Sequence, residues 1–199
     1  MMLEKEQQHT MLRIDPIWLP ESQQQQFRHM LEAMARPGEC YELASLPQNG
    51  PAVLSILATL LDKSVTLADP DDQLRDEDWL MLQARPALAE QADYILCDGL
   101  QTPEFSPRLG NLSHPEQSAT LIICVNELSN HAQGKAFLNL RLKGPGIADT
   151  QHLYISGLHY DWIGQRRSWN HEFPMGVDMI FIDQRRISAL PRTTHVEVH

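Results

Sequence analysis

The residues best suited to chemistry lie near the C-terminus, in Pro191-Arg192-Thr193-Thr194-His195. A guanidinium fork and two hydroxyl donors match the geometry of a phosphate-like oxyanion. The same groups can instead hydrogen-bond to the chain's own backbone or to another subunit. No second Arg or Lys follows nearby to complete an anion clamp, so we expect Arg192, Thr193 and Thr194 to serve the chain's own backbone or an interface.

Two further patterns contain groups that could react or bind phosphate. Asp178 follows a Pro-Met-Gly-Val turn and enters an apolar run, where it could act as a general base. Carboxylates in such places more often accept hydrogen bonds from nearby backbone N–H groups. The turn Lys143-Gly144-Pro145-Gly146 lacks the spacing of a phosphate-binding P-loop, and Pro145 has no N–H to offer. We therefore expect it to be a structural turn.

The final residues suggest a metal site, which their position argues against. His195, Glu197 and His199 alternate, so in a strand they would share one face and could hold a transition metal. Terminal residues usually fray, however, and a solvated polar face is the better interpretation. The three cysteines, Cys40, Cys97 and Cys124, lie far apart and form no CxxC pair. The sequence thus predicts no metal, no disulfide framework and no cofactor, and free thiols in a reducing cytosol.

Composition excludes several classes of function. The chain has 199 residues and a formal net charge of −10, with 16 basic and 26 acidic residues. Nucleic-acid binders and proteins of anionic membrane surfaces depend on clustered positive charge, so we expect neither kind of partner. The N-terminus has no apolar signal-peptide core, and no run of 18 apolar residues occurs, so the prediction is a cytoplasmic protein.

Periodicity places a helix near the N-terminus. Phe27, Met30, Leu31 and Met34 recur at helical spacing and predict one buried stripe, which Pro37-Gly38 ends. We expect the glutamines at 23–26 to form a solvated face. Residues 1–20 are predicted to be an extended lead-in, with Pro16 and Pro20 as breakers, and residues 21–199 to form a single domain.

The remaining predicted elements include both helices and strands. Helices are expected at 53–61 and 71–83. Short apolar or alternating runs predict strands at 64–69, 94–97, 120–125, 137–142, 152–157, 178–182 and 187–190, and the last two strands should form a hairpin. The expected class is therefore α/β, with a mixed central sheet flanked by helices.

Four segments together resemble one known family. They are FRHMLEAMARPGE at 27–39, SHPEQSATLIICV at 113–125, LKGPGI at 142–147 and FPMGVDMIFIDQRRISALPRTTHVEV at 173–198. In this order they are similar to the H-subunit family of the bacterial carbon-phosphorus lyase machinery. Arg28, within the first segment, joins Arg192, Thr193, Thr194 and Asp178 as a candidate binding or interface residue.

The resemblance implies a role in a complex that lets bacteria use alkylphosphonates. It implies partner subunits G, I, J and L, and a step in which phosphonate displaces adenine from ATP to give ribose 1-phosphonate 5-triphosphate. The H subunit itself is implied to be accessory, without assigned catalytic residues and dimeric in isolation. Its implied fold resembles the large domain of pyridoxal-phosphate transferases without the cofactor.

The alternative is a stand-alone small-molecule transferase or lyase, most sharply a pyridoxal-phosphate enzyme. That chemistry requires a lysine for the Schiff base, typically desolvated. The chain has Lys5, Lys63, Lys135 and Lys143. Their sequence contexts are the lead-in, two surface turns and the polar face of a strand, and none predicts a buried lysine.

Overall fold

The computed structural model describes residues 14–132 and 134–199. A short 3-10 turn, η1 (Pro16–Trp18), leads into helix α1 (Pro20–Ala35). Proline at the first helical position needs no N–H partner, so Pro20 begins the helix instead of breaking the chain. Residues 1–13 of the predicted lead-in lie outside the described part, and the rest is ordered by Asp15, whose side chain accepts a hydrogen bond from the Ile17 backbone N–H at 3.2 Å.

The other helices are short. They are α2 (Leu54–Leu60), α3 (Asp76–Leu82), α4 (Asp161–Trp169) and the 3-10 turn η2 (Pro115–Gln117). Helix α3 begins five residues later than predicted, because Asp69 accepts the backbone N–H groups of Gln73 and Leu74 and holds the preceding segment as a turn. Within the described residues, none of these helices is long and apolar enough to cross a membrane.

The main sheet has seven strands in the order β1-β10-β9-β5-β4-β2-β3. Strands β2, β3, β4, β5 and β9 are parallel, and β10 returns antiparallel to β9, which confirms the predicted hairpin. The strands are β1 (Tyr41–Glu42), β2 (Thr66–Ala68), β3 (Arg85–Pro86), β4 (Tyr94–Asp98), β5 (Thr120–Cys124), β9 (Asp178–Ile182) and β10 (Arg186–Leu190). The α/β class with a mixed sheet is thus confirmed.

A second, antiparallel sheet adds a layer that the sequence patterns did not separate from the first. It runs β11-β7-β8-β6. Its strands are β6 (Glu127–Ser129), β7 (Leu138–Lys143), β8 (Gln151–Ser156) and β11 (His195–Val198). The clean alternation in β7 buries Leu140 and Leu142 and leaves Arg141 and Lys143 on the outer face, as expected for a sheet with one wet side.

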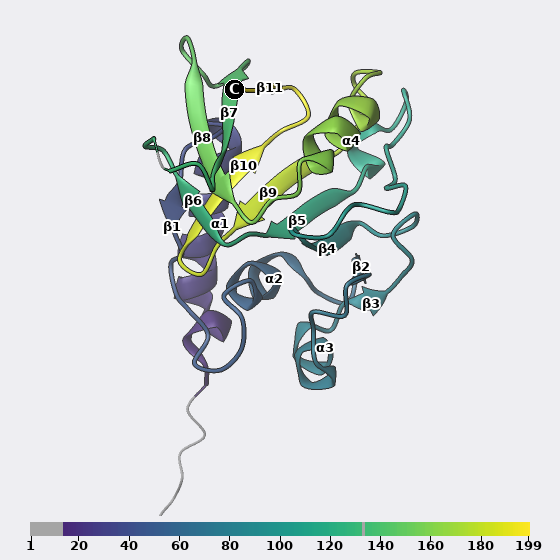
Figure 1. The fold of residues 1–199 in the computed structure, drawn as a ribbon. Coiled ribbons are helices and arrows are strands. Elements are labelled where there is room, and N and C mark those ends of the chain that lie inside the picture. Colours follow the sequence, from purple (N-terminus) through teal and green to yellow (C-terminus); the bar gives the residue numbers. More distant parts are fainter. Residues whose placement is uncertain (1–13, 133) are drawn as a thin grey trace, which may run out of the picture.

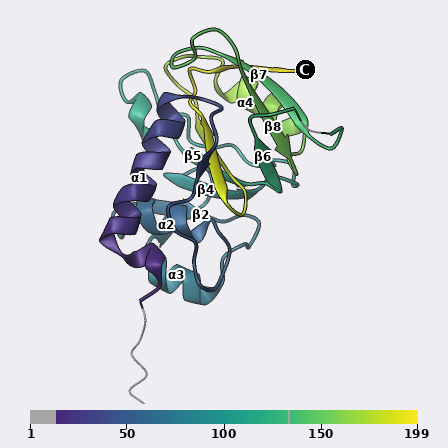
Figure 2. The ribbon, with the colours of Figure 1, turned by 90° about the vertical axis from the view of Figure 1, so that its left-hand side faces the viewer.

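The main sheet therefore lies between two unlike layers (Figure 1), and the turned view of Figure 2 shows α1 on one side and β6–β8 on the other. Side chains at alternate positions of these strands pack into two separate hydrophobic cores. Ile95, Cys97, Leu121, Ile123, Met179 and Phe181 pack toward the second sheet and α4. Leu96, Ile122, Ile180 and Ile182 pack toward α1 and α2. Strands buried on both faces explain why β4, β5 and β9 read as continuous apolar runs.

The buried face of α1 differs from the predicted stripe. Met30 is buried as expected, but Phe27 and Leu31 are 47% and 53% exposed. The prediction that the glutamines are solvated is wrong for Gln26, which is 1% exposed and accepts a hydrogen bond from the Ala44 backbone N–H at 2.8 Å. The helix is rotated by its packing on β10 and α2, which places Gln26 and Ala33 inward beside Met30.

Candidate functional site

Arg192 and Asp178, both singled out from the sequence, form an ion pair in the structure. Asp178 is the first residue of β9, and Arg192 follows the neighbouring strand β10. The backbone N–H of Arg192 donates to Asp178 Oδ1 at 2.7 Å, and its Nη2 donates to Oδ2 at 2.7 Å. Both side chains are mostly buried, with 16% and 17% exposure. Antiparallel pairing of β9 and β10 brings these residues together across 14 positions of sequence.

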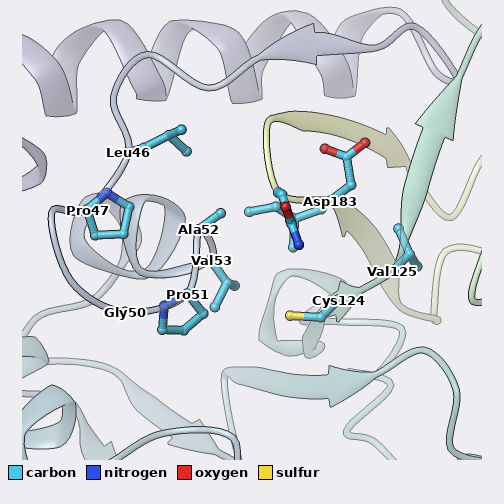
Figure 3. A pocket seen from close by; sticks show the side chains of 11 residues that line it. Leu46, Pro47, Gly50, Pro51, Ala52, Val53, Cys124, Val125 and Asp183 are labelled. Carbon is cyan, nitrogen blue, oxygen red and sulfur yellow. The ribbon is translucent and has the colours of Figure 1, made fainter.

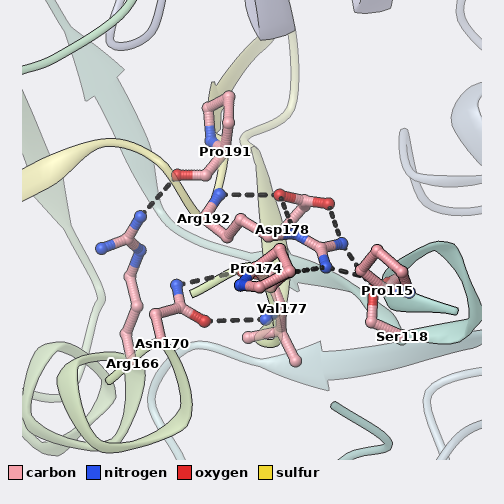
Figure 4. A network of polar contacts seen from close by, with 9 residues as sticks. All are labelled: Pro115, Ser118, Arg166, Asn170, Pro174, Val177, Asp178, Pro191 and Arg192. Carbon is pink, nitrogen blue, oxygen red and sulfur yellow. Dashed lines mark hydrogen bonds and ion pairs between the residues drawn. The ribbon is translucent and has the colours of Figure 1, made fainter. Parts of the chain in front are cut away.

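The guanidinium of Arg192 has its donors engaged within the chain (Figure 4). Nη1 donates to the carbonyl oxygens of Pro115 at 3.0 Å and Pro174 at 3.2 Å. Nη2 also donates to Ser118 Oγ, and Nε to Asp178 Oδ1 at 3.3 Å. A guanidinium carries five N–H donors, and five acceptors surround this one. In this arrangement Arg192 ties the strand ends to the η2 loop and leaves no free fork for an oxyanion.

A second arginine, Arg166 on α4, contacts the backbone next to Arg192. Arg166 Nη2 donates to the Pro191 carbonyl oxygen at 2.6 Å. Burial lowers the pKa of Arg166 to about 10, and the charge of Asp178 opposes this shift. Asn170, one turn later, holds the turn before β9, because its amide accepts from Val177 N at 2.7 Å and donates to Val177 O at 3.1 Å (Figure 4).

The other predicted site residues are placed differently. Thr194 is 3% exposed, its backbone N–H donates to Pro191 O at 2.9 Å, and its hydroxyl has no hydrogen-bond partner in the described part of the chain. Thr193 is half-buried beside Gly144. Arg28 is exposed on α1 and is not among the contacts of Arg192. The structure thus pairs Arg192 with Asp178, whereas the two threonines only follow Arg192 in the chain and Arg28 lies apart.

Sequence reasoning did not find the partners Ser118, Arg166 and Asn170. They lie on η2's C-terminal side and on α4, up to 74 positions from Arg192. No local spacing joins these positions. The one available signal was the polar Ser118, two residues before the buried strand β5.

The terminal residues and the glycine turn have structural surroundings. Glu197 on β11 is paired with Arg141 on β7, and this pairing lowers the pKa of Glu197. No group of three His, Cys, Asp or Glu side chains suited to a metal occurs among the residues that the structure describes. Gly146 has a φ of +83°, and a side chain there would collide with the Ala35 carbonyl at the end of α1. The turn therefore packs closely on the helix, as a structural turn does.

A pocket of about 380 Å³ lies at the carboxyl ends of β5 and β9 (Figure 3). Ligands of open α/β sheets usually bind at this edge. Its lining is Leu46, Pro47, Gly50, Pro51, Ala52, Val53, Cys124, Val125, Ile182, Asp183 and Gln184. Sequence reasoning missed it, although Gly50-Pro51 ahead of a helix and Asp183 after a strand are typical of such loops.

The ionisable groups in this pocket are poorly suited to catalysis. Burial raises the pKa of Cys124 to about 12, which leaves little nucleophilic thiolate near neutral pH. Asp183 is 6% exposed and accepts hydrogen bonds from the backbone N–H groups of Leu128, Arg185 and Arg186 at 2.9, 2.7 and 2.6 Å. These groups hold the β9–β10 turn together, so the pocket offers an apolar binding surface more than a reactive one.

Comparison with known proteins places the chain in a family. The sequence profile of the bacterial phosphonate metabolism protein (PhnH) matches residues 17–197. The chain is 40% identical over 182 residues to the putative C-P lyase subunit protein HtxG of Stutzerimonas stutzeri, covering 92% of this chain and 89% of that protein. It is 25% identical over 194 residues to the α-D-ribose 1-methylphosphonate 5-triphosphate synthase subunit PhnH of Rhizobium meliloti strain 1021, covering 92% of each. The chain therefore belongs to the bacterial phosphonate metabolism protein (PhnH) family.

Proposed function

We propose that this chain is an accessory subunit of a bacterial carbon-phosphorus lyase complex and is required for the use of alkylphosphonates. The observation that carries the proposal is the 40% identity, over 92% of the chain, to a protein described as a C-P lyase subunit. The step served is the displacement of adenine from ATP by phosphonate, which gives α-D-ribose 1-phosphonate 5-triphosphate. The proposed partners are subunits G, I, J and L, and the proposed state in isolation is a cytoplasmic homodimer.

The geometry supports an accessory role over a catalytic one. The strongest polar constellation, Arg192 with Asp178, is saturated by groups of the same chain. The thiol in the sheet-edge pocket is held protonated, because burial raises the pKa of Cys124. We propose that substrate chemistry lies on other subunits and that this chain positions or completes them.

We also propose that the fold corresponds to the large domain of pyridoxal-phosphate transferases without the cofactor. A seven-stranded mixed sheet with β10 antiparallel to its neighbours supports this correspondence. The alternative, a working pyridoxal-phosphate enzyme, is disfavoured. Lys63, Lys135 and Lys143 are all exposed, and Lys5 lies outside the described residues.

The test is reconstitution with ATP and methylphosphonate. We expect the purified chain alone to release no adenine, and co-expression with subunits G, I, J and L to yield a co-eluting complex whose activity depends on this chain. Turnover by the chain alone that is abolished by one substitution here would contradict the accessory role. Failure to co-elute with any of these subunits would contradict the assignment to the complex.

A further inference from the structure

Helix α3 exposes apolar side chains instead of burying them. Leu80 and Met81 are 79% and 54% exposed, whereas Asp78 and Leu82 of the same helix are buried. The helix is therefore attached to the domain by one face and presents two large apolar residues on another. Large exposed apolar side chains are candidates for macromolecular contact when they adjoin further apolar surface.

Two hollows flank Leu80. The first, of about 740 Å³, lies between the start of α1, the end of α2 and α3, and Ile14, Trp18, Leu60 and Met81 contribute to its wall. The second, of about 400 Å³, is lined by Asp76, Trp79, Leu80, Ala84 and Pro86. Figure 1 shows α3 and β3 together at one end of the molecule. We call the two hollows, with Leu80 and Met81, the α3 surface.

The charge of the α3 surface is of one sign. Asp15 and Asp62 line the first hollow and Asp76 lines the second. Among the described residues that line either hollow there is no Lys, Arg or His. Hydrogen bonds from Ser64 lower the pKa of Asp62, so this exposed carboxylate is ionised at neutral pH.

We propose that the α3 surface docks an amphipathic segment of another subunit, which presents apolar side chains flanked by Lys or Arg. The apolar residues match the two hollows, and the three carboxylates favour a basic partner. A protein segment fits better than a small molecule, because Leu80 borders both hollows and only an extended partner covers both. That the partner is a subunit of the complex rests on the proposed function; the docking chemistry does not.

A synthetic helical peptide with one leucine face and lysine edges tests the docking chemistry directly. Trp18 and Trp79 line the hollows and report binding by fluorescence. We expect the wild type to bind this peptide at least tenfold more tightly than a matched peptide with glutamate edges. The variant Leu80→Gln/Met81→Gln keeps the protein's charge and should lose this binding, whereas Leu112→Gln, at an equally exposed leucine, should not. Equal binding of both peptides, or binding that survives Leu80→Gln/Met81→Gln, overturns the proposal.

Charge and assembly give two further readouts. Asp62→Asn should weaken peptide binding several-fold and Asp149→Asn should not, because Asp62 lines the α3 surface and Asp149 lines a different hollow. In co-expression with subunits G, I, J and L, Leu80→Gln/Met81→Gln should elute separately while its melting temperature stays that of the wild type. If this variant assembles normally, the proposal fails and the proposed function stands. If the wild type does not assemble, the proposed function fails and the peptide titration alone decides the docking.

If the α3 surface binds a second copy of this chain or the chain's own N-terminal segment, the measurements give different results. A wild-type dimer that dissociates in the Leu80→Gln/Met81→Gln variant would assign the α3 surface to a second copy of this chain. A tenfold gain in peptide affinity on Leu12→Gln would assign it to the segment that precedes Ile14. Either result overturns the proposal.

Discussion

Arg192 is expected to contribute to stability through its buried contacts. Replacing it by Ala leaves the largely buried Asp178 carboxylate without its cation, along with the Pro115 and Pro174 carbonyl oxygens. Unpaired buried groups of this kind cost free energy, and we expect Arg192→Ala to lower the unfolding free energy by about 2–4 kcal/mol. Denaturant titration followed by circular dichroism measures this change.

Arg141→Ala is the matched control for Arg192→Ala. Arg141 also pairs with a carboxylate, Glu197, but that pair is exposed to solvent. Exposed pairs contribute little, so the control should unfold nearly like the wild type. Calorimetry should detect no change in affinity for ATP or methylphosphonate on Arg192→Ala. A folded, assembling Arg192→Ala protein that has lost binding of either ligand would instead make Arg192 part of an anion site.

At the scale of elements, the orientation of α1 is the feature most open to test. Met30 is 4% exposed and Leu31 is 53% exposed, although both belong to the apolar stripe in the sequence. Met30→Ala should lower the unfolding free energy by about 2–4 kcal/mol, because it empties part of the core between α1 and the main sheet. Leu31→Ala should change it by less than about 0.5 kcal/mol. Urea titration of the two variants tests which face of α1 is packed. Similar losses of unfolding free energy for both would indicate that the apolar stripe expected from the sequence, with Leu31 included, is the buried face.

For the whole molecule, buried thiols predict a loss of stability in alkaline solution. Burial raises the pKa of Cys40 and of Cys124 from 9.0 to about 12, and raises that of Cys97 well above 9.0. Between pH 9 and pH 12 the unfolded chain releases thiol protons that the folded chain retains, so the unfolding free energy falls as pH rises. The expected loss is about 1 kcal/mol per thiol between pH 9 and pH 10.

The lowered pKa of Arg166 has the opposite effect on stability, and this effect begins at higher pH. Burial lowers the pKa of Arg166 to about 10, below its ordinary value, so this group raises the unfolding free energy only as the pH rises above about 10. Urea titrations between pH 8 and pH 10 therefore exclude the effect of Arg166. Burial also raises the pKa of Tyr41 and of Tyr94 above 10.0, so comparison with the Cys124→Ala variant isolates the share of that thiol. Cys124→Ala should flatten the slope, and an unchanged slope in that variant would show that this thiol is not the source.

The sequence by itself determined the class of fold and many of its elements, but it did not reveal α4 or the strands β1, β3 and β6. Continuous apolar runs specified β4, β5 and β9, alternation specified β7, and the polar residues after Ile182 specified the hairpin to β10. These features depend on neighbours within a few positions, where side-chain period and turn chemistry act. Local pattern also pointed to Asp178, at the start of one predicted strand, and to Arg192, shortly after the end of the next.

Only the tertiary structure decided which groups meet. It separated β7, β8, β11 and β6 into their own sheet, since strand pairing joins segments far apart in the chain. It brought Ser118 to Arg192 across 74 positions and turned Gln26 inward while leaving Leu80 outside. Periodicity states that a helix has an apolar face, but the direction of that face depends on what packs against it. The partners of a polar side chain and the exposure of an apolar one are properties of packing, which no local pattern contains.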